Sequence, residues 1–276
     1  MPISVLWELA LLPILLSGGF MVVHMSLKTH DGISAAVLGG LVCLIFILSE
    51  GPPPFFPISS KQKIPYILAT IATAAIILRH ARPSARAAAT AALLLGGFLW
   101  LVQRQLSGGA FQTRWILPLL AAVVLTAAVR FQNSNAPSRF AWPVTLLAMM
   151  TVTGVIALLG GFIGVGQIMM SISVCFGGVV LLLFLAALRK TGPTLPALPA
   201  SALWAITTAF GILLILIGTY ATNLSTGAYL LVLTMILAPS IERFTTARPL
   251  WAHPFIFAAV AALPALPAVF LAVLNF

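Results

Sequence analysis

Long runs of apolar residues alternate with short polar breaks along the whole chain. Each run approaches the roughly 20 residues that an α-helix needs to cross the hydrocarbon core of a bilayer. Charges, proline-rich stretches and Gly/Asn turns separate the runs. The pattern predicts ten membrane-spanning helices over residues 3–25, 33–48, 64–78, 87–102, 115–129, 141–160, 166–188, 201–221, 227–241 and 254–275.

One division in this scheme is weak. Residues 141–188 are interrupted only by "GGFIGVGQ", and if that stretch is one long kinked helix the count falls to nine. Gly160 and Gly164 form a G-x-x-x-G pattern, which predicts close helix packing or a hinge. The runs at 64–78, 87–102 and 115–129 are short, so they require snorkelling side chains or a locally thinner bilayer.

Composition supports the same fold class. The chain is 61% hydrophobic and only 7% charged, whereas a soluble domain carries about 25% charged residues. We therefore expect an all-α, polytopic transmembrane bundle that forms a single domain over residues 1–276. The loops "GPPPFFPISS" and "GPTLPALPAS" precede the third and eighth helices. They predict two halves, 1–139 and 140–276, related as an inverted repeat.

Positive charge predicts the orientation. Of the 14 Lys and Arg residues, the odd connections carry Lys28, Arg79, Arg82, Arg86, Arg130, Arg139, Arg189, Lys190, Arg243 and Arg248. The even connections carry only Lys61, Lys63, Arg104 and Arg114. The positive-inside rule then puts the odd connections in the cytoplasm and both termini outside. Trp and Tyr fall near predicted helix ends, as in interfacial belts.

The net charge of +10 does not indicate nucleic acid, because no basic stripe is interleaved with aromatic residues. We expect anionic lipid headgroups on the cytoplasmic side as partners, contacted by Arg79, Arg82 and Arg86. Other membrane subunits are further candidate partners. The predicted location is a cell membrane, with the bacterial inner membrane as the specific expectation.

Candidate chemistry is sparse. The sequence contains no P-loop, H-E-x-x-H or G-x-S-x-G motif, and we expect no catalytic site, metal or cofactor. Glu8 lies just inside the first helix, where a carboxylate either reaches interfacial water or marks a substrate or ion path. Gln167 and Ser171 either line such a path or bond a neighbouring helix.

The stretch "SEGPPPFFPISSKQKIPY", residues 49–66, is the most unusual connection. Its prolines predict an extended, stiff connector outside the membrane. Phe55 and Phe56 are expected at the interface, and Lys61 and Lys63 are expected close enough to pair with Glu50.

Three motifs, "EGPPPFFP", "LLGGFIGVGQ" and "GAYLLVLTMILAP", resemble bacterial polytopic integral membrane proteins to which no activity is assigned. Ten helices in a chain of this length also resemble the plan of the drug/metabolite transporter superfamily, although that superfamily usually keeps its termini inside. The architectural resemblance implies transport.

Three functions remain open at this point. The first is transport of a small neutral or amphipathic solute or lipid between the two halves. The second is a non-catalytic membrane subunit or scaffold of a larger complex. The third is an intramembrane enzyme that uses Glu8 and Glu50.

Overall fold

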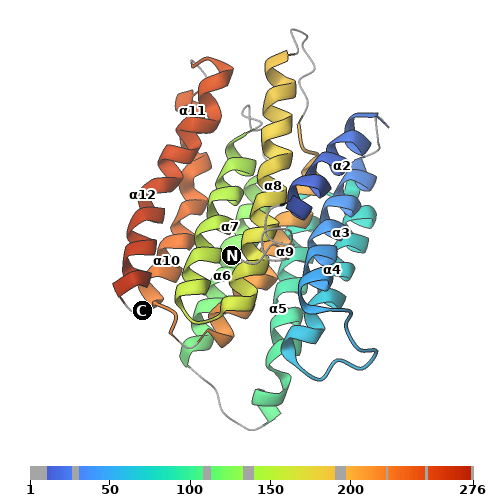
Figure 1. The fold of residues 1–276 in the computed structure, drawn as a ribbon, viewed down its shortest axis with the longest axis vertical. Helices are drawn as coiled ribbons and strands as arrows, with labels where there is room; N and C mark the ends of the chain where they lie inside the picture. Colours follow the sequence, from blue (N-terminus) through green and yellow to red (C-terminus); the bar gives the residue numbers. More distant parts are fainter. Residues whose placement is uncertain are drawn as a thin grey trace.

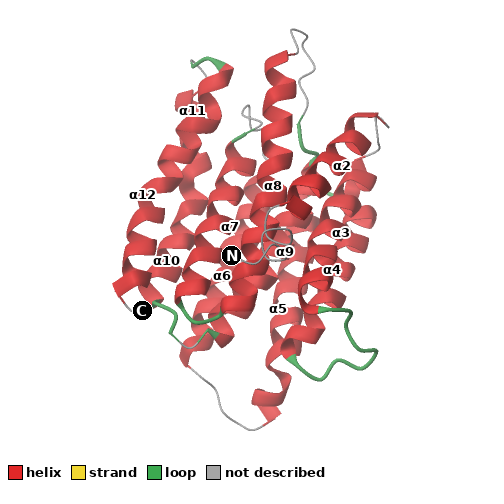
Figure 2. Ribbon diagram, in the orientation of Figure 1, coloured by secondary structure: helices red, strands yellow, loops and turns green. Residues whose placement is uncertain are grey.

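A computed structural model describes residues 11–26, 31–107, 113–132, 140–189, 197–221, 223–245 and 248–274. This part of the chain is all-α and contains no strand (Figure 2). The α-helices are α2 (Leu12–Ser26), α3 (Asp31–Glu50), α4 (Ser60–Ile77), α5 (Pro83–Ser107), α6 (Ile116–Gln132), α7 (Ala141–Leu159), α8 (Ile163–Arg189), α9 (Ala200–Tyr220), α10 (Thr226–Thr234), α11 (Glu242–Thr245) and α12 (His253–Leu274). Short 3₁₀ segments are η2 (Leu78–His80), η3 (Thr113–Trp115), η4 (Met235–Ile241) and η5 (Leu250–Ala252).

Each of the ten predicted ranges contains helix, so the predicted fold class is confirmed. Seven helices in the described ranges are long and apolar enough to cross a membrane, and the apolar helices 116–132 and 226–241 are shorter. The ninth range is divided, because α10 continues into the 3₁₀ helix η4, which contains Pro239. A proline lacks the backbone N–H of a regular helix and disturbs its hydrogen bonds.

The α7–α8 connection is a tight hairpin, so the nine-helix alternative is wrong. Gly161 has φ +78°, which favours glycine because a Cβ is disfavoured there. Its N–H donates to Leu158 O (3.2 Å), and the Phe162 N–H donates to Ala157 O (2.9 Å). These two bonds form a Schellman motif that ends α7. Gly160 and Gly164 therefore lie on either side of a turn and do not form a packing motif on one helix.

The helices run alternately up and down the long axis of the bundle (Figure 1). The C-terminal ends of α2, α4, α6 and α8 lie at one end, and the C-terminal ends of α3, α5, α7 and α12 lie at the other (Figure 1). We call the first end inner and the second end outer, after the charge-based prediction of orientation.

Helix α9 occupies the centre of the bundle. Its residues 204–219 are all buried, and it packs against α3, α4, α5 and α6. Close approach is possible because small residues lie at the crossings. A Cβ on Gly211 would come within 2.8 Å of Leu94 and 2.9 Å of Leu125. A helix of the second predicted half thus fills the space between four helices of the first.

Several helices are longer than predicted, and α5 and α4 show the reason. Helix α5 has 25 residues, against the shorter predicted run of 87–102, and α4 begins at Ser60. The sequence pattern breaks at Lys63 and Arg86, but both side chains are buried in the bundle and helix continues through them. Pro65 likewise lies inside α4, so the extended connector covers 51–59 rather than the whole stretch 49–66.

Aromatic residues provide a second correction. Trp115, Trp204 and Tyr229 are fully buried within the bundle, although the sequence predicts interfacial belts. The hydroxyl of Tyr229 donates to Leu214 O at 3.1 Å. Trp100 and Trp251 are exposed at the outer and inner ends, where an interfacial position remains consistent with the prediction.

Candidate functional site

The outer end of α3 is defined by glycine and proline. Gly51 has φ +88°, and its N–H donates to Ile47 O at 2.8 Å, which ends the helix. Residues 51–59 then run without helix to α4. Helix α4 begins with a capping box, in which Ser59 accepts from the Gln62 N–H and the Gln62 side chain accepts from the Ser59 N–H.

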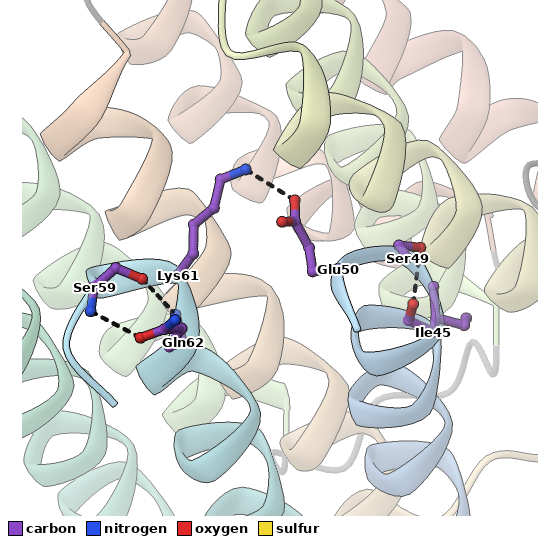
Figure 3. A network of polar contacts seen from close by, with 6 residues as sticks. All are labelled: Ile45, Ser49, Glu50, Ser59, Lys61 and Gln62. Carbon is purple, nitrogen blue, oxygen red and sulfur yellow. Dashed lines mark hydrogen bonds and ion pairs between the residues drawn. The ribbon is translucent and has the colours of Figure 1, made fainter. Parts of the chain in front are cut away.

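An ion pair links the two helices beside this loop. Lys61 Nζ lies 2.9 Å from Glu50 Oε1, and Figure 3 shows Lys61 reaching from the start of α4 toward the end of α3. Glu50 Oε1 also lies 3.1 Å from the position that a Cβ on Gly164 would take. The carboxylate therefore faces the N-terminus of α8, whose dipole favours a negative charge. Lys61 Nζ is 6.0 Å from the ring centroid of Phe162.

A second polar group at the outer end, which we call the outer cluster, contains Ser60, Lys63 and Tyr220. Lys63 is 5% exposed, donates to Trp100 O at 2.6 Å and lies 5.6 Å from the Trp100 ring centroid. Ser60 and Tyr220 both donate to Leu101 O, at 3.0 and 2.8 Å. The cluster joins α4, α5 and α9, and Lys63 does not pair with Glu50.

A matching group at the inner end, the inner cluster, contains Arg86, Thr90, Trp204 and Thr208. Trp204 Nε1 donates to Arg86 O (3.0 Å) and to Thr90 Oγ1 (2.8 Å). Thr90 and Thr208 lie 3.2 Å apart, oxygen to oxygen. The Arg86 guanidinium donates to the carbonyls of Leu78 and Arg79 in η2, directly after α4, where a cation complements the helix dipole.

The two clusters lie at opposite ends of one interface, the seam between α5 and α9. Its middle is apolar and tightly packed: a Cβ on Gly97 would lie 2.7 Å from Ile212 Cδ1 and 3.6 Å from Ile67. A Cβ on Gly211 would lie 2.8 Å from Leu94 Cδ2. The seam is therefore polar at both ends and closed in the middle by aliphatic side chains packed against glycines.

A pocket of about 200 Å³ opens at the outer end, next to the ion pair. Its walls come from the end of α3, the proline-rich loop and the first turns of α4. The lining residues are Phe46, Glu50, Gly51, Pro52, Pro53, Pro54, Ser59, Lys61, Gln62 and Pro65.

The remaining predicted residues are dispersed. Glu8 lies outside the described residues. Gln167 is exposed on the surface of α8, whereas Ser171 on the same helix is buried. Arg79 and Arg82 are exposed, and contact with lipid headgroups stays a prediction for them. Arg86 is 7% exposed and bonds to backbone carbonyls, so the structure places it inside the bundle.

Sequence reasoning missed five residues of the clusters: Ser60, Thr90, Trp204, Thr208 and Tyr220. Each hydroxyl or indole sits near the end of an otherwise apolar helix. The available signal was that these residues lie at matching depths on facing helices. That signal can be used only when α5 and α9 are known to be neighbours.

The described part of the chain contains no group of three or more His, Cys, Asp or Glu side chains that could hold a metal ion. The apolar helices and their alternating connections define a multi-pass integral membrane protein. Comparison with known protein families, curated proteins and solved structures yields no match.

Proposed function

We propose that the protein transports a small neutral or amphipathic solute or lipid along the seam between α5 and α9. The observation that carries this proposal is the arrangement of the seam, with a polar cluster at each end and an apolar closure between them. A solute moving through a membrane protein needs polar groups where it leaves water, and a closure that prevents leakage.

The middle of the seam favours uncharged cargo. Leu94, Gly97, Gly211 and Ile212 offer aliphatic surface and no charge. A charge placed there would lose its hydration without a partner. The transfer of an uncharged solute would cost much less free energy, because only its unpaired hydrogen bonds are lost in an apolar environment.

The glycines at the crossings support movement of the two helices. Gly97 and Gly211 present no side chain, so α5 and α9 touch through aliphatic side chains of their partners. Such aliphatic contacts can slide by a fraction of a helical turn, as in shear motions, and the hydrogen bonds of the inner and outer clusters would have to rearrange as α5 and α9 move. The helices also come from the two predicted halves, which alternating access moves against each other.

The packing of α9 favours the second function, a non-catalytic membrane subunit. Sixteen consecutive α9 residues, 204–219, are buried, which suits a rigid anchor. The two functions differ in one measurable respect: a transporter must open the seam, and an anchor keeps it closed.

Cysteine accessibility tests this difference without knowledge of the substrate. In a Cys43→Ala/Cys175→Ala background, Ile212→Cys places a thiol in the middle of the seam. Met150→Cys is the matched control, because Met150 is equally buried in the middle of α7. We expect a membrane-impermeant maleimide to label Cys at 212 from both sides of oriented vesicles and to leave position 150 unlabelled. Protection of position 212 from both sides would refute transport through the seam and favour the subunit.

A further inference from the structure

The pocket beside the proline-rich loop brings opposite charges together, and its lining is more polar than apolar. Glu50 and Lys61 line it, and their side chains keep 27% and 40% of their surface exposed. Each group therefore retains capacity for another partner. Four prolines, at 52, 53, 54 and 65, also line the pocket.

The tip of the loop is apolar and unsupported by the bundle. Phe55 and Phe56 are 86% and 79% exposed, and their rings pack against each other with centroids 4.9 Å apart. Ile58 is also exposed. Large exposed apolar patches mark interaction sites. At the end of a transmembrane bundle, the apolar phase within reach of this tip is the lipid itself.

The loop is held in position by hydrogen bonds on its α4 side. Tyr66 Oη donates to Pro54 O at 2.8 Å, and Gln62 Oε1 accepts from the N–H groups of Ile58 and Ser59. Together with the prolines, these bonds fix the pocket before any ligand arrives. A preformed site loses less entropy on binding.

We propose that this pocket binds the headgroup of a zwitterionic phospholipid that carries a primary ammonium, such as phosphatidylethanolamine, from the outer leaflet. Lys61 pairs with the phosphate, Glu50 accepts hydrogen bonds from the ammonium, and Phe55 and Phe56 lie among the neighbouring acyl chains. The pocket volume of about 200 Å³ is enough for several water molecules and hence for a small polar headgroup.

Charge complementarity selects this occupant. A zwitterion matches the Glu50–Lys61 pair at both ends, so the site gains two charge-assisted hydrogen bonds without a net charge. An anionic headgroup without an amine would meet Lys61 but be repelled by Glu50. A quaternary ammonium has no N–H to donate to the carboxylate. The inference is independent of transport through the seam.

The test uses the purified, delipidated protein in detergent and native mass spectrometry. Equimolar dihexanoyl phosphatidylethanolamine, phosphatidylglycerol and phosphatidylcholine compete for wild type, Glu50→Gln, Lys61→Gln and Arg104→Gln. Arg104 is a basic residue at the same end that does not line the pocket. Size-exclusion profiles verify that each variant is folded.

We expect wild type and Arg104→Gln to prefer phosphatidylethanolamine. Glu50→Gln should weaken its binding roughly tenfold or more, because the ammonium loses its charged acceptor. Lys61→Gln should weaken all phospholipids. A Phe55→Ser/Phe56→Ser variant, altered only at the exposed tip, should keep the headgroup preference and retain less long-chain lipid during purification.

Several results would overturn the proposal. Equal binding of the three lipids by wild type would do so, and so would identical behaviour of Glu50→Gln and Arg104→Gln. Soluble phosphoethanolamine that binds as tightly as the lipid would identify a site for a free solute. Retention of long-chain lipid by the Phe55→Ser/Phe56→Ser variant at the wild-type level would remove the role of the loop tip.

Discussion

Gly166 on α8 offers a sharp test of how the α7–α8 hairpin is held together. A Cβ at this position would lie 2.8 Å from Leu158 Cγ and 2.9 Å from the Leu158 backbone nitrogen. Ordinary contact begins near 3.4 Å, so Gly166→Ala requires α7 and α8 to separate by about 0.5 Å. A backbone atom cannot rotate away as a side-chain end can.

Two opposing contributions determine how much Gly166→Ala changes the free energy of unfolding. Overpacking of a tight interface costs about 1–3 kcal/mol, while alanine in place of glycine within a helix gains up to about 1 kcal/mol. We therefore expect Gly166→Ala to lower the free energy of unfolding by up to about 2 kcal/mol, and to be about 1–3 kcal/mol less stable than an alanine variant that gains helix propensity without overpacking. Gly96→Ala on α5 is the matched control, because nothing lies within 4 Å of its Cβ position. It should be neutral or stabilising.

The measurement is equilibrium unfolding in mixed micelles as the fraction of denaturing detergent rises, followed by tryptophan fluorescence. The difference between the two variants cancels the helix-propensity term and leaves the overpacking cost. Gly154→Ala should fall between them, because its Cβ would meet the flexible Met170 side chain first, at 2.8 Å. Equal stability of Gly166→Ala and Gly96→Ala would refute the close approach of the helices.

Two further predictions concern the same unfolding assay. Gly161→Ala should lower the free energy of unfolding by about 1 kcal/mol or more, because φ +78° is strained for a residue with a Cβ. Gly161→Asn should lower it less, because Asn tolerates this conformation. An alanine variant as stable as the asparagine variant would contradict the Schellman turn. Trp204→Phe removes the donor to Arg86 O and Thr90 Oγ1 and should cost about 1–3 kcal/mol, since buried acceptors lose a partner. Trp251→Phe at an exposed position should stay within about 0.5 kcal/mol, and an equal effect of the two would show that the inner cluster adds no stability.

The helical segments could be predicted from the sequence because the bilayer imposes a simple rule. Backbone groups in hydrocarbon must bond within their own segment, so length and hydropathy indicate where helices lie. The boundaries were less accurate at charged residues. Lys63 and Arg86 looked like helix ends, but their side chains find carbonyl partners inside the bundle, and the helices continue.

The candidate site was predicted only in part, because some of its contacts join residues close in the sequence and others join helices far apart in the sequence. Glu50 and Lys61 flank one short loop, so their proximity is a local property that the sequence indicates. The inner cluster joins Thr90 to Trp204 and Thr208 across more than a hundred residues. In a uniformly apolar chain, every helix has a similar surface, and no periodic signal specifies that α5 faces α9. Gln167 looked like an interior polar residue for the same reason, and the structure places it on the surface.

The central position of α9 constrains how the protein is made. Its partners α3, α4, α5 and α6 are synthesised earlier and enter the bilayer while the space between them has no protein to fill it. The native packing of these four helices therefore cannot be complete until α9 has been synthesised. Late steps of assembly then include the close packing of α9 against α5 at Gly97 and Gly211 and the docking of α12 on α7. A chain arrested before residue 200 would hold a partly assembled bundle that quality-control proteases could recognise by its missing centre.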